Sequence, residues 1–238
     1  MPNSSFAFKQ FTINQDKCAM KVGTDAVLLG AWVIPNGSTS ILDIGTGTGI
    51  IALMLAQKSQ AKIEAIDIDE NAVNQARQNV SGSKFSSSVS VSHTSLQDFA
   101  KTADKKFNLI VTNPPYFEQS LKSSDTQRSN ARHADVLPFE DLIEGVLKLL
   151  AAKGKFCLIL PKLEAEKFRE QAEKRGLHLS KLMRIKSRAD KEVDKRHLMQ
   201  FEFTPTEFSE TTLVIEEKER HHYTPEYKEL TKDYYVNF

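Results

Sequence analysis

The chain has 238 residues, of which 40% are hydrophobic and 26% are charged, so it is long enough to bury a sizeable core. Its formal net charge of +1 gives no global field typical of a nucleic-acid binder, although a local basic patch is compatible with it. Two cysteines, Cys18 and Cys157, are too few for a disulfide framework or a cysteine-rich metal site. Because the chain shows neither a signal-peptide pattern nor an apolar run of about 20 residues, we expect a soluble, cytoplasmic protein.

Short apolar runs alternate with segments of helical length and periodicity along most of the chain. The runs predict strands at residues 39–45, 62–68, 107–113 and 155–161, and the period-two alternation of residues 88–93 predicts a fifth strand. The periodic segments predict helices at residues 50–58, 71–80, 138–153 and 164–175, the last two closed by Gly154 and Gly176. This alternation predicts an α/β fold, with a parallel sheet and helices on both of its faces.

Two further strands are predicted near the C-terminus, at residues 179–187 and 197–205. Only a short charged link joins them, so they should be antiparallel to each other. The residues after 205 are polar and aromatic, and we expect a tail that forms a lid or a packed helix. We therefore predict one domain over residues 1–238, with an N-terminal segment (1–40), a core (41–205) and a tail (206–238).

A glycine-rich loop follows the first predicted strand. It reads DIGTGTGI and carries Asp43, Gly45, Gly47 and Gly49. Glycines at the amino end of a helix let the backbone turn sharply and approach a ligand. The spacing is G-x-G-x-G rather than the G-x-G-x-x-G of dinucleotide-binding proteins. It resembles motif I of class I S-adenosylmethionine-dependent methyltransferases.

An acidic residue, Asp67, ends the second predicted strand, 18 residues after Gly49. A carboxylate at this place suits the two hydroxyls of a ribose, because it offers acceptors on two oxygens. The alternative is that Asp67 is only a loop or helix-capping acid, a role for which Asp69 is the stronger candidate.

The fourth predicted strand ends at Asn113-Pro114-Pro115-Tyr116. We expect this strand beside the first, and ligands of open parallel sheets bind at the carboxyl ends of the strands. The carbonyl oxygens of the Asn113 side chain and the Pro114 main chain suit the hydrogens of an amine, the prolines fix φ, and Tyr116 offers a ring face. Bound in this way, the amine would direct its lone pair toward a methyl sulfonium, for direct in-line displacement. The alternative is a stiff turn with a packed tyrosine.

These four residues resemble the (D/N/S)PP(Y/F) motif of amino-methyltransferases, which act on adenine N6, cytosine N4, guanine N2 or glutamine N5. Together with residues 11–32, 42–57 and 131–133, they make the chain similar to the bacterial tRNA1(Val) (adenine-37-N6)-methyltransferase family over roughly residues 7–205. The resemblance implies a Rossmann-like fold whose seven-stranded, mostly parallel sheet has an antiparallel terminal strand. It also implies S-adenosyl-L-methionine as the cofactor, the anticodon loop of tRNA as the partner, no metal, and a monomer.

The resemblance assigns roles to individual residues. It implies Asp43 and the three glycines around the cofactor, Asp67 on its ribose, Asp98 near its adenine amine, Gly23, Thr24 and Asp25 near its methionine end, and Asn113, Pro114, Pro115 and Tyr116 at the target adenine. Considered without the resemblance, residues 23–25 are a helix start with a side-chain cap, and Asp98 is a solvated loop acid.

Basic residues are the candidates for contacts with RNA phosphates. They are Lys122, Arg128, Arg132 and His133 after the Asn-Pro-Pro-Tyr motif, and Arg184, Lys186, Arg188, Lys195 and Arg196 near the terminal strands. The alternative for each is a solvated charged loop. His221 and His222 lack further ligands at a recognisable spacing, so we do not expect them to bind a metal.

Several other functions remain as alternatives. A protein glutamine-N5 or ribosomal guanine-N2 methyltransferase would share both motifs, but the first usually has a helical domain before the sheet and the second a two-domain chain. A DNA adenine methyltransferase would need a target-recognition insertion that the chain lacks. A nicotinamide-dependent oxidoreductase is disfavoured by the loop spacing, and a non-catalytic RNA-binding module by the presence of both motifs.

Overall fold

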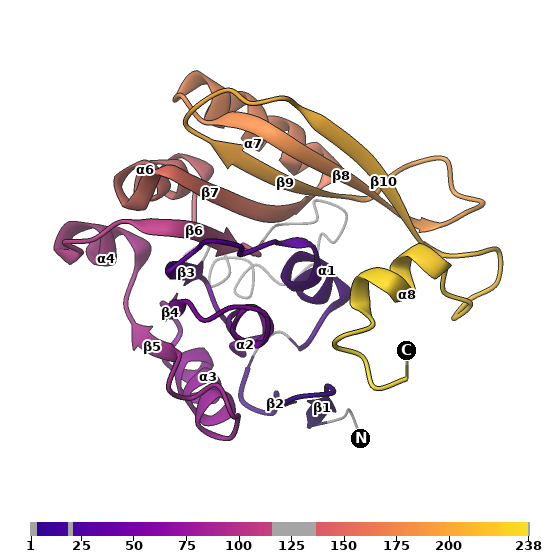
Figure 1. The fold of residues 1–238 in the computed structure, drawn as a ribbon, viewed down its shortest axis with the longest axis horizontal. Helices are drawn as coiled ribbons and strands as arrows, with labels where there is room; N and C mark the ends of the chain where they lie inside the picture. Colours follow the sequence, from indigo (N-terminus) through magenta and orange to yellow (C-terminus); the bar gives the residue numbers. More distant parts are fainter. Residues whose placement is uncertain (1–3, 19–20, 116–136, 238) are drawn as a thin grey trace, which may run out of the picture.

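The structure, a computed structural model, describes residues 4–18, 21–115 and 137–237 (Figure 1). Its main sheet consists of β3 (Ser40–Ile44), β4 (Lys62–Asp67), β5 (Val89–His93), β6 (Phe107–Thr112), β7 (Leu150–Pro161), β8 (His178–Arg188), β9 (Arg196–Glu202) and β10 (Ser209–Glu216). These strands lie in the order β10-β8-β9-β7-β6-β3-β4-β5. The five predicted core strands are all present, and β6 pairs with β3 as expected.

Among the described strands of this sheet, only β9 is antiparallel to the others. It pairs antiparallel with both β7 and β8, which confirms the predicted antiparallel relation of the last two expected strands. The expected number of strands is wrong, because β10 adds an eighth strand parallel to β8. The antiparallel strand therefore lies inside the sheet and not at its edge.

Helices cover both faces of the sheet, as predicted (Figure 1). They are α1 (Thr24–Trp32), α2 (Ile50–Gln57), α3 (Glu70–Ser81), α4 (Leu96–Thr102), α6 (Phe139–Leu149), α7 (Lys162–Lys174) and α8 (Pro225–Thr231). One face carries α1, α2, α3 and α8, and the other carries α4, α6 and α7. Within the described ranges, no helix has the length and apolar character needed to cross a bilayer.

The sheet has a hydrophobic core on each face, and successive side chains of a strand pack alternately into one core and the other. In β6, Leu109 and Val111 point into the core under α1 and α2, whereas Ile110 points into the core under α4, α6 and α7. In β3, Ile41 and Leu42 divide in the same way. Successive side chains of a strand point to opposite faces, so a sheet covered on both sides needs apolar residues at nearly every position. This is why β3 and β6 appear in the sequence as nearly continuous apolar runs.

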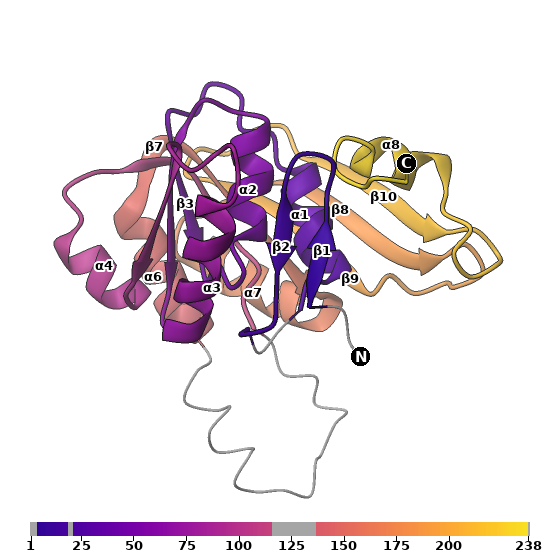
Figure 2. The same ribbon diagram turned by 90° about the horizontal axis from the view of Figure 1, so that it is seen from below.

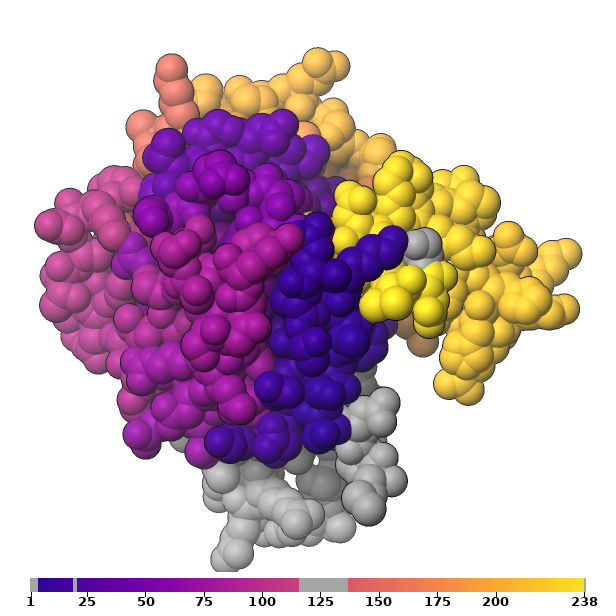
Figure 3. All heavy atoms as spheres, turned by 60° about the horizontal axis from the view of Figure 1, so that its bottom comes forward, coloured from indigo at the N-terminus to yellow at the C-terminus, as the bar shows by residue number. Residues whose placement is uncertain are grey.

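The two ends of the chain lie side by side on one surface (Figures 2 and 3). A hairpin of β1 (Ser5–Ala7) and β2 (Thr12–Asn14) contacts the C-terminal segment, where Lys9 N–H donates to the Tyr234 carbonyl at 2.8 Å. The Tyr234 hydroxyl in turn donates to the Met54 carbonyl of α2 at 3.2 Å. The expected tail is therefore a strand and a helix that pack on the core, with β10 extending the sheet.

The end of α6 also differs from its prediction. The apolar run Leu149-Leu150-Ala151-Ala152 favoured a helix that continues to Gly154, but α6 ends at Leu149 and β7 begins at once. Leu150 pairs with Phe107, and the register then shifts so that Leu109 pairs with Lys155. Gly154 lies within β7, where an added Cβ would come within 2.9 Å of the Phe107 carbonyl. The close approach of the two strands, and not a helix cap, explains this glycine.

We predict that Gly145→Ala destabilises the fold, because α6 touches α4 at this glycine. An added Cβ would lie 2.6–2.9 Å from three side-chain atoms of the buried Leu96. Overpacking costs about 1–3 kcal/mol, and alanine recovers about 1 kcal/mol of helix propensity, so we expect a net loss of about 1 kcal/mol, and at most about 2 kcal/mol. Urea unfolding measures it. Gly82→Ala is the control, since its added Cβ meets nothing closer than 3.4 Å; an equal effect of both changes would contradict the packing argument.

Candidate active site

The carboxyl ends of three neighbouring strands bring the predicted residues together. Ile44 of β3 pairs with Thr112 of β6 and with Ile66 of β4. The next residues along these strands are Gly45 after Ile44, Asn113 after Thr112 and Asp67 after Ile66. They therefore lie at the same level on adjacent strands, which are about 4.8 Å apart. The Thr112 hydroxyl donates to the Ile44 carbonyl at 2.8 Å and ties the ends of β3 and β6 together.

The glycine turn exposes its backbone above this edge of the sheet. Gly45, Gly47 and Gly49 all have positive φ (68°, 55° and 81°), a region that other residues rarely adopt. The N–H groups of Gly45 and Thr46 both donate to the Ile66 carbonyl, which folds the turn back onto β4. A Cβ added at Gly45 or Gly47 would meet nothing within 4 Å. The turn therefore leaves open space against its main chain, as the approach of a ligand to the backbone requires.

Asp67 holds the glycine turn in place. Its Oδ2 accepts from the Gly47 N–H at 2.8 Å, and its Oδ1 accepts from the Asp69 N–H at 3.0 Å. Burial raises the pKa of Asp67, and the backbone donors oppose that shift. A carboxylate has about four acceptor positions, so these bonds leave capacity for a ligand hydroxyl. Asp69, and not Asp67, caps α3, by accepting from the Asn71 N–H at 2.8 Å.

Asp43 lies directly beneath the turn and is completely buried. Its Oδ2 accepts a 2.6 Å bond from the Thr46 hydroxyl, whereas its Oδ1 has no partner among the described residues. Burial raises the pKa of the Asp43 carboxyl to about 7, against the opposing effect of bonds from Thr46 and the Ala52 backbone. The turn is therefore built over a carboxyl group that titrates near neutral pH.

Asn113 carries a second buried acceptor without a partner. The residue is half-buried, and its Oδ1 is shielded from solvent without a hydrogen bond to any described residue. A buried acceptor left unpaired costs about 1–3 kcal/mol, so such groups in native structures call for an explanation. Pro114 is buried and Pro115 is exposed, whereas Tyr116 lies outside the described residues. The Asn113 carbonyl is available to a ligand with N–H groups.

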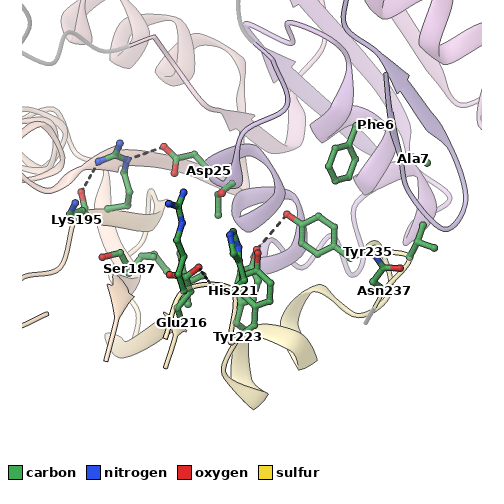
Figure 4. Close-up of a pocket in the computed structure, with 17 residues that line it drawn as sticks. Phe6, Ala7, Asp25, Ser187, Lys195, Glu216, His221, Tyr223, Tyr235 and Asn237 are labelled. Carbon is green, nitrogen blue, oxygen red and sulfur yellow. Dashed lines mark hydrogen bonds and ion pairs between the residues drawn. The ribbon is translucent and has the colours of Figure 1, made fainter. Parts of the chain in front are cut away.

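The remaining predicted cofactor residues lie along the same edge. Gly23 is the N-cap residue of α1, so the helix begins without a side-chain cap, and the Asp25 carboxylate accepts a 2.9 Å bond from Arg196 Nε (Figure 4). Arg196 pairs with Pro161, the last residue of β7, which places Asp25 at the carboxyl edge of the sheet. Asp98 is exposed in the first turn of α4, where bonds from Lys101 and Ser95 lower its pKa.

Known proteins resemble the chain over most or all of its length. The sequence signature of the methyltransferase small domain family matches residues 19–163. Proteins named tRNA1(Val) (adenine(37)-N6)-methyltransferase from Phocaeicola vulgatus and Trichodesmium erythraeum are 47% and 45% identical to it, each over 100% of both chains. The chain belongs to the tRNA1(Val) (adenine(37)-N6)-methyltransferase family.

The fold of the family agrees with that of solved methyltransferases. The crystal structure of a predicted O-methyltransferase from Agrobacterium tumefaciens superposes with a TM-score of 0.70 at 18% identity, covering 88% of this chain and 96% of that one. The class I methyltransferase fold is thereby confirmed, and the protein is an S-adenosyl-L-methionine-dependent methyltransferase. The residues present fit that cofactor, because the open glycine backbone and the spare acceptor capacity of Asp67 lie on adjacent strands.

Two features of the site were not predicted from the sequence. Ile68 directly follows Asp67 and is 58% exposed, so it offers an apolar surface beside the ribose-binding candidate. An isoleucine between two aspartates at a strand end was the available sign. The partner of Asp25, Arg196, is 171 residues away in the sequence, and its spacing carries no information.

The predicted RNA contacts are only partly described. Lys122, Arg128, Arg132 and His133 lie outside the described residues. Arg188 is described, and its guanidinium donates two hydrogen bonds to Asp190, at 2.6 and 2.7 Å. A nearby carboxylate reduces its use as a phosphate ligand. No group of three or more candidate metal ligands occurs in the part of the chain that the structure describes.

We predict that Asp43 makes the stability of the protein fall as pH rises. Its folded pKa of about 7 lies above the ordinary value of 3.8, so the folded state holds the proton more tightly, and stability is lost between about pH 4 and 7. Three pKa units correspond to at most about 4 kcal/mol. The measurement is the difference in free energy of unfolding between the wild type and Asp43→Asn across this range. A difference that does not change with pH would contradict the assignment.

Proposed function

We propose that the protein methylates the exocyclic N6 amine of an adenosine in tRNA, at position 37 of tRNA1(Val), beside the anticodon. The observation that carries the proposal is the unpartnered, shielded Oδ1 of Asn113 at the level of the glycine turn. An N–H group of the substrate would satisfy that oxygen. The names of the relatives support adenosine 37 as the position.

The main chemical problem is the low nucleophilicity of the adenine amine, whose lone pair is delocalised into the ring. In our proposal, the Asn113 side-chain carbonyl and the Pro114 main-chain carbonyl accept the two amine hydrogens. Holding both hydrogens out of the ring plane favours a tetrahedral-like nitrogen and directs its lone pair toward the glycine turn on the adjacent strand. Pro114 and Pro115 fix the backbone at this place before the substrate arrives.

S-adenosyl-L-methionine supplies an electrophilic methyl group on a sulfonium. With the cofactor bound, the amine nitrogen would form the new C–N bond as the C–S bond breaks, and sulfur would keep the electron pair of that bond. Methylation makes the amine protons acidic, so the nitrogen would then release one of them to solvent. No strong base is needed before the transfer, so the residues named have only to position the amine and stabilise charge. The chain's own contribution is the rigid geometry at the ends of β3 and β6.

The target base must leave its stack to reach Asn113. Unstacking costs a few kcal/mol, and least where the base is already outside a duplex, as in an anticodon loop. We also propose that the protein works as a monomer in the cytoplasm. In the described residues, its large exposed apolar side chains come from separate segments and do not form a run along one element: Ile34, Ile68, Leu163, Val193, Phe208 and Val236.

We expect the purified protein to methylate unmodified tRNA and not peptides. Mass spectrometry of digested tRNA, with and without the protein and S-adenosyl-L-methionine, should show N6-methyladenosine only in the complete reaction. Methylation of a glutamine-containing release-factor peptide without methylation of tRNA would instead favour the protein glutamine-N5 alternative. N2-methylguanosine in ribosomal RNA would favour the guanine-N2 alternative.

We predict that Asn113→Ala lowers kcat by about 100-fold or more, by analogy with the loss of one positioned hydrogen-bonding group in other active sites. The free energy of unfolding should stay the same or rise, because the change removes an unsatisfied buried acceptor. Asn113→Asp keeps an oxygen acceptor and should retain far more activity. Calorimetry with S-adenosylhomocysteine should show cofactor affinity within about twofold of the wild type for both variants. Near-normal turnover in Asn113→Ala would show that the amine is held elsewhere.

A further inference from the structure

A cavity of about 650 Å³ lies between the two ends of the chain and the last strands of the sheet. Figure 4 shows Asp25, Ser187 and Lys195 on one side of its lining and Phe6, Tyr235 and Asn237 on the other. Glu216, His221 and Tyr223 lie between them. This volume falls within the range of about 300–1,000 Å³ that is typical of small-molecule sites.

The cavity combines aromatic rings with positive charge. Phe6, Tyr223, Tyr227 and Tyr235 supply the rings, and Lys195, Arg196 and Arg220 supply the cations. Its two carboxylates are already engaged, because Asp25 accepts from Arg196 and Glu216 Oε1 accepts from the His221 N–H at 2.9 Å. Lys195 and Arg220 are exposed, and neither forms an ion pair with a described carboxylate.

The cavity opens on the same edge of the sheet as Asn113. Ile185 near the end of β8 and Glu216 at the end of β10 both line it, and both strands are parallel to β6 and β7. From β6 the sheet passes through β7 and β9 to β8 and then β10. The strand pairings place Ile185 three residues, and Glu216 six residues, beyond the level of Thr112 along the strands. At about 4.8 Å per strand and about 3.3 Å per residue, Ile185 and Glu216 are about 17 and about 28 Å from the end of β6. Stacked nucleotides advance about 3.4 Å each, so these distances equal about five to eight nucleotides of a stacked strand.

We propose that this cavity binds a second, unpaired nucleotide of the same RNA, about five to eight positions from the target adenosine. The inference rests on the proposed function and adds to it a specificity site at the sheet's far end. The base would stack on Tyr223 or Tyr235, and its phosphate would lie between Lys195 and Arg220. Aromatic faces with adjacent cations are the usual means of holding single-stranded nucleic acid. An acidic peptide would use the cations but would leave the ring faces without a planar partner.

The segments that build the cavity fit this role. Tyr223 and Tyr227 have ring centroids 5.2 Å apart with their planes tilted by 31°, and Phe6 meets Tyr235 edge-on with centroids 6.0 Å apart. The half-buried rings of Phe6, Tyr223 and Tyr235 are therefore held in place by neighbouring rings. Thr24 and Asp25 line the cavity and also belong to the segment expected near the cofactor. A nucleotide in the cavity would therefore lie next to the start of α1, on the way from β10 to the glycine turn.

The test measures RNA affinity. The probe is a fluorescent RNA hairpin with the sequence of the unmodified anticodon stem and loop of tRNA1(Val), titrated with full-length protein over a range of salt concentrations. Arg220→Ala and Lys195→Ala should each weaken binding about fivefold or more. Each should also reduce the slope of log affinity against log salt concentration by about one. Tyr223→Leu should weaken binding about fivefold or more without changing the salt dependence. Lys218→Ala is the matched control, because Lys218 is an exposed cation two residues from Arg220 that does not line the cavity.

Three results would overturn the proposal. If the wild type binds the hairpin, and Arg220→Ala and Lys218→Ala weaken this binding by the same small factor, the proposed cavity site is refuted but the proposed function is not. If a polyglutamate peptide displaces the hairpin, and Tyr223→Leu binds the hairpin with unchanged affinity, the ligand of the cavity is an acidic peptide and not a nucleotide. Failure of the wild type to bind the hairpin would refute the proposed function together with the cavity. In every variant, thermal unfolding and affinity for S-adenosylhomocysteine should match the wild type, so that a loss of RNA affinity is assigned to the cavity.

Discussion

The parallel pairing of Ile44 with both Thr112 and Ile66 is the constraint on which the site depends. It sets three strand ends at one level, so that the glycine turn, a carboxylate and an amide follow from adjacent strands. The hydroxyl of Thr112 reinforces this level by its bond to Ile44. Both faces of the sheet are packed against helices, so a shift of one strand by one residue would exchange the apolar side chains of both cores. The site geometry is therefore as firmly determined as the core itself.

The polar groups and the backbone conformations of the candidate site lower the stability of the folded state. In the described residues, three buried side-chain atoms lack a hydrogen-bond partner, and two of them, Asp43 Oδ1 and Asn113 Oδ1, lie at this edge of the sheet. The turn between them uses three glycines with positive φ. Unsatisfied polar groups and unusual backbone conformations gather at functional sites because the surrounding structure holds them there. The packed cores on both faces provide that support, and a substrate amine would satisfy Asn113.

Much of this arrangement followed from the sequence because it depends on local signals. The strands β3, β4, β6 and β7 contain apolar runs that are largely buried, whereas β5 is mostly exposed and was predicted from its period-two alternation. The rule that ligands bind at carboxyl ends placed Asp67, Asn113 and the glycines together. Strand β10 was missed because seven of its eight residues are at least partly exposed and its sequence is polar, although Thr211, Thr212, Val214 and Ile215 are β-branched. The bond between Asp25 and Arg196 and the cavity beyond it join segments far apart in the chain, which no local pattern reveals.

The central claim is that the Asn113 carbonyl holds the substrate amine opposite the glycine turn. The most direct measurement is a crystal structure of the protein with S-adenosylhomocysteine and an RNA hairpin that carries the target adenosine. Our account predicts that Asn113 Oδ1 lies within hydrogen-bonding distance, about 3 Å, of the adenine N6, with the cofactor's sulfur on the other side of that nitrogen. An adenine bound with N6 away from Asn113, or an Asn113 carboxamide paired with the protein instead, would contradict it.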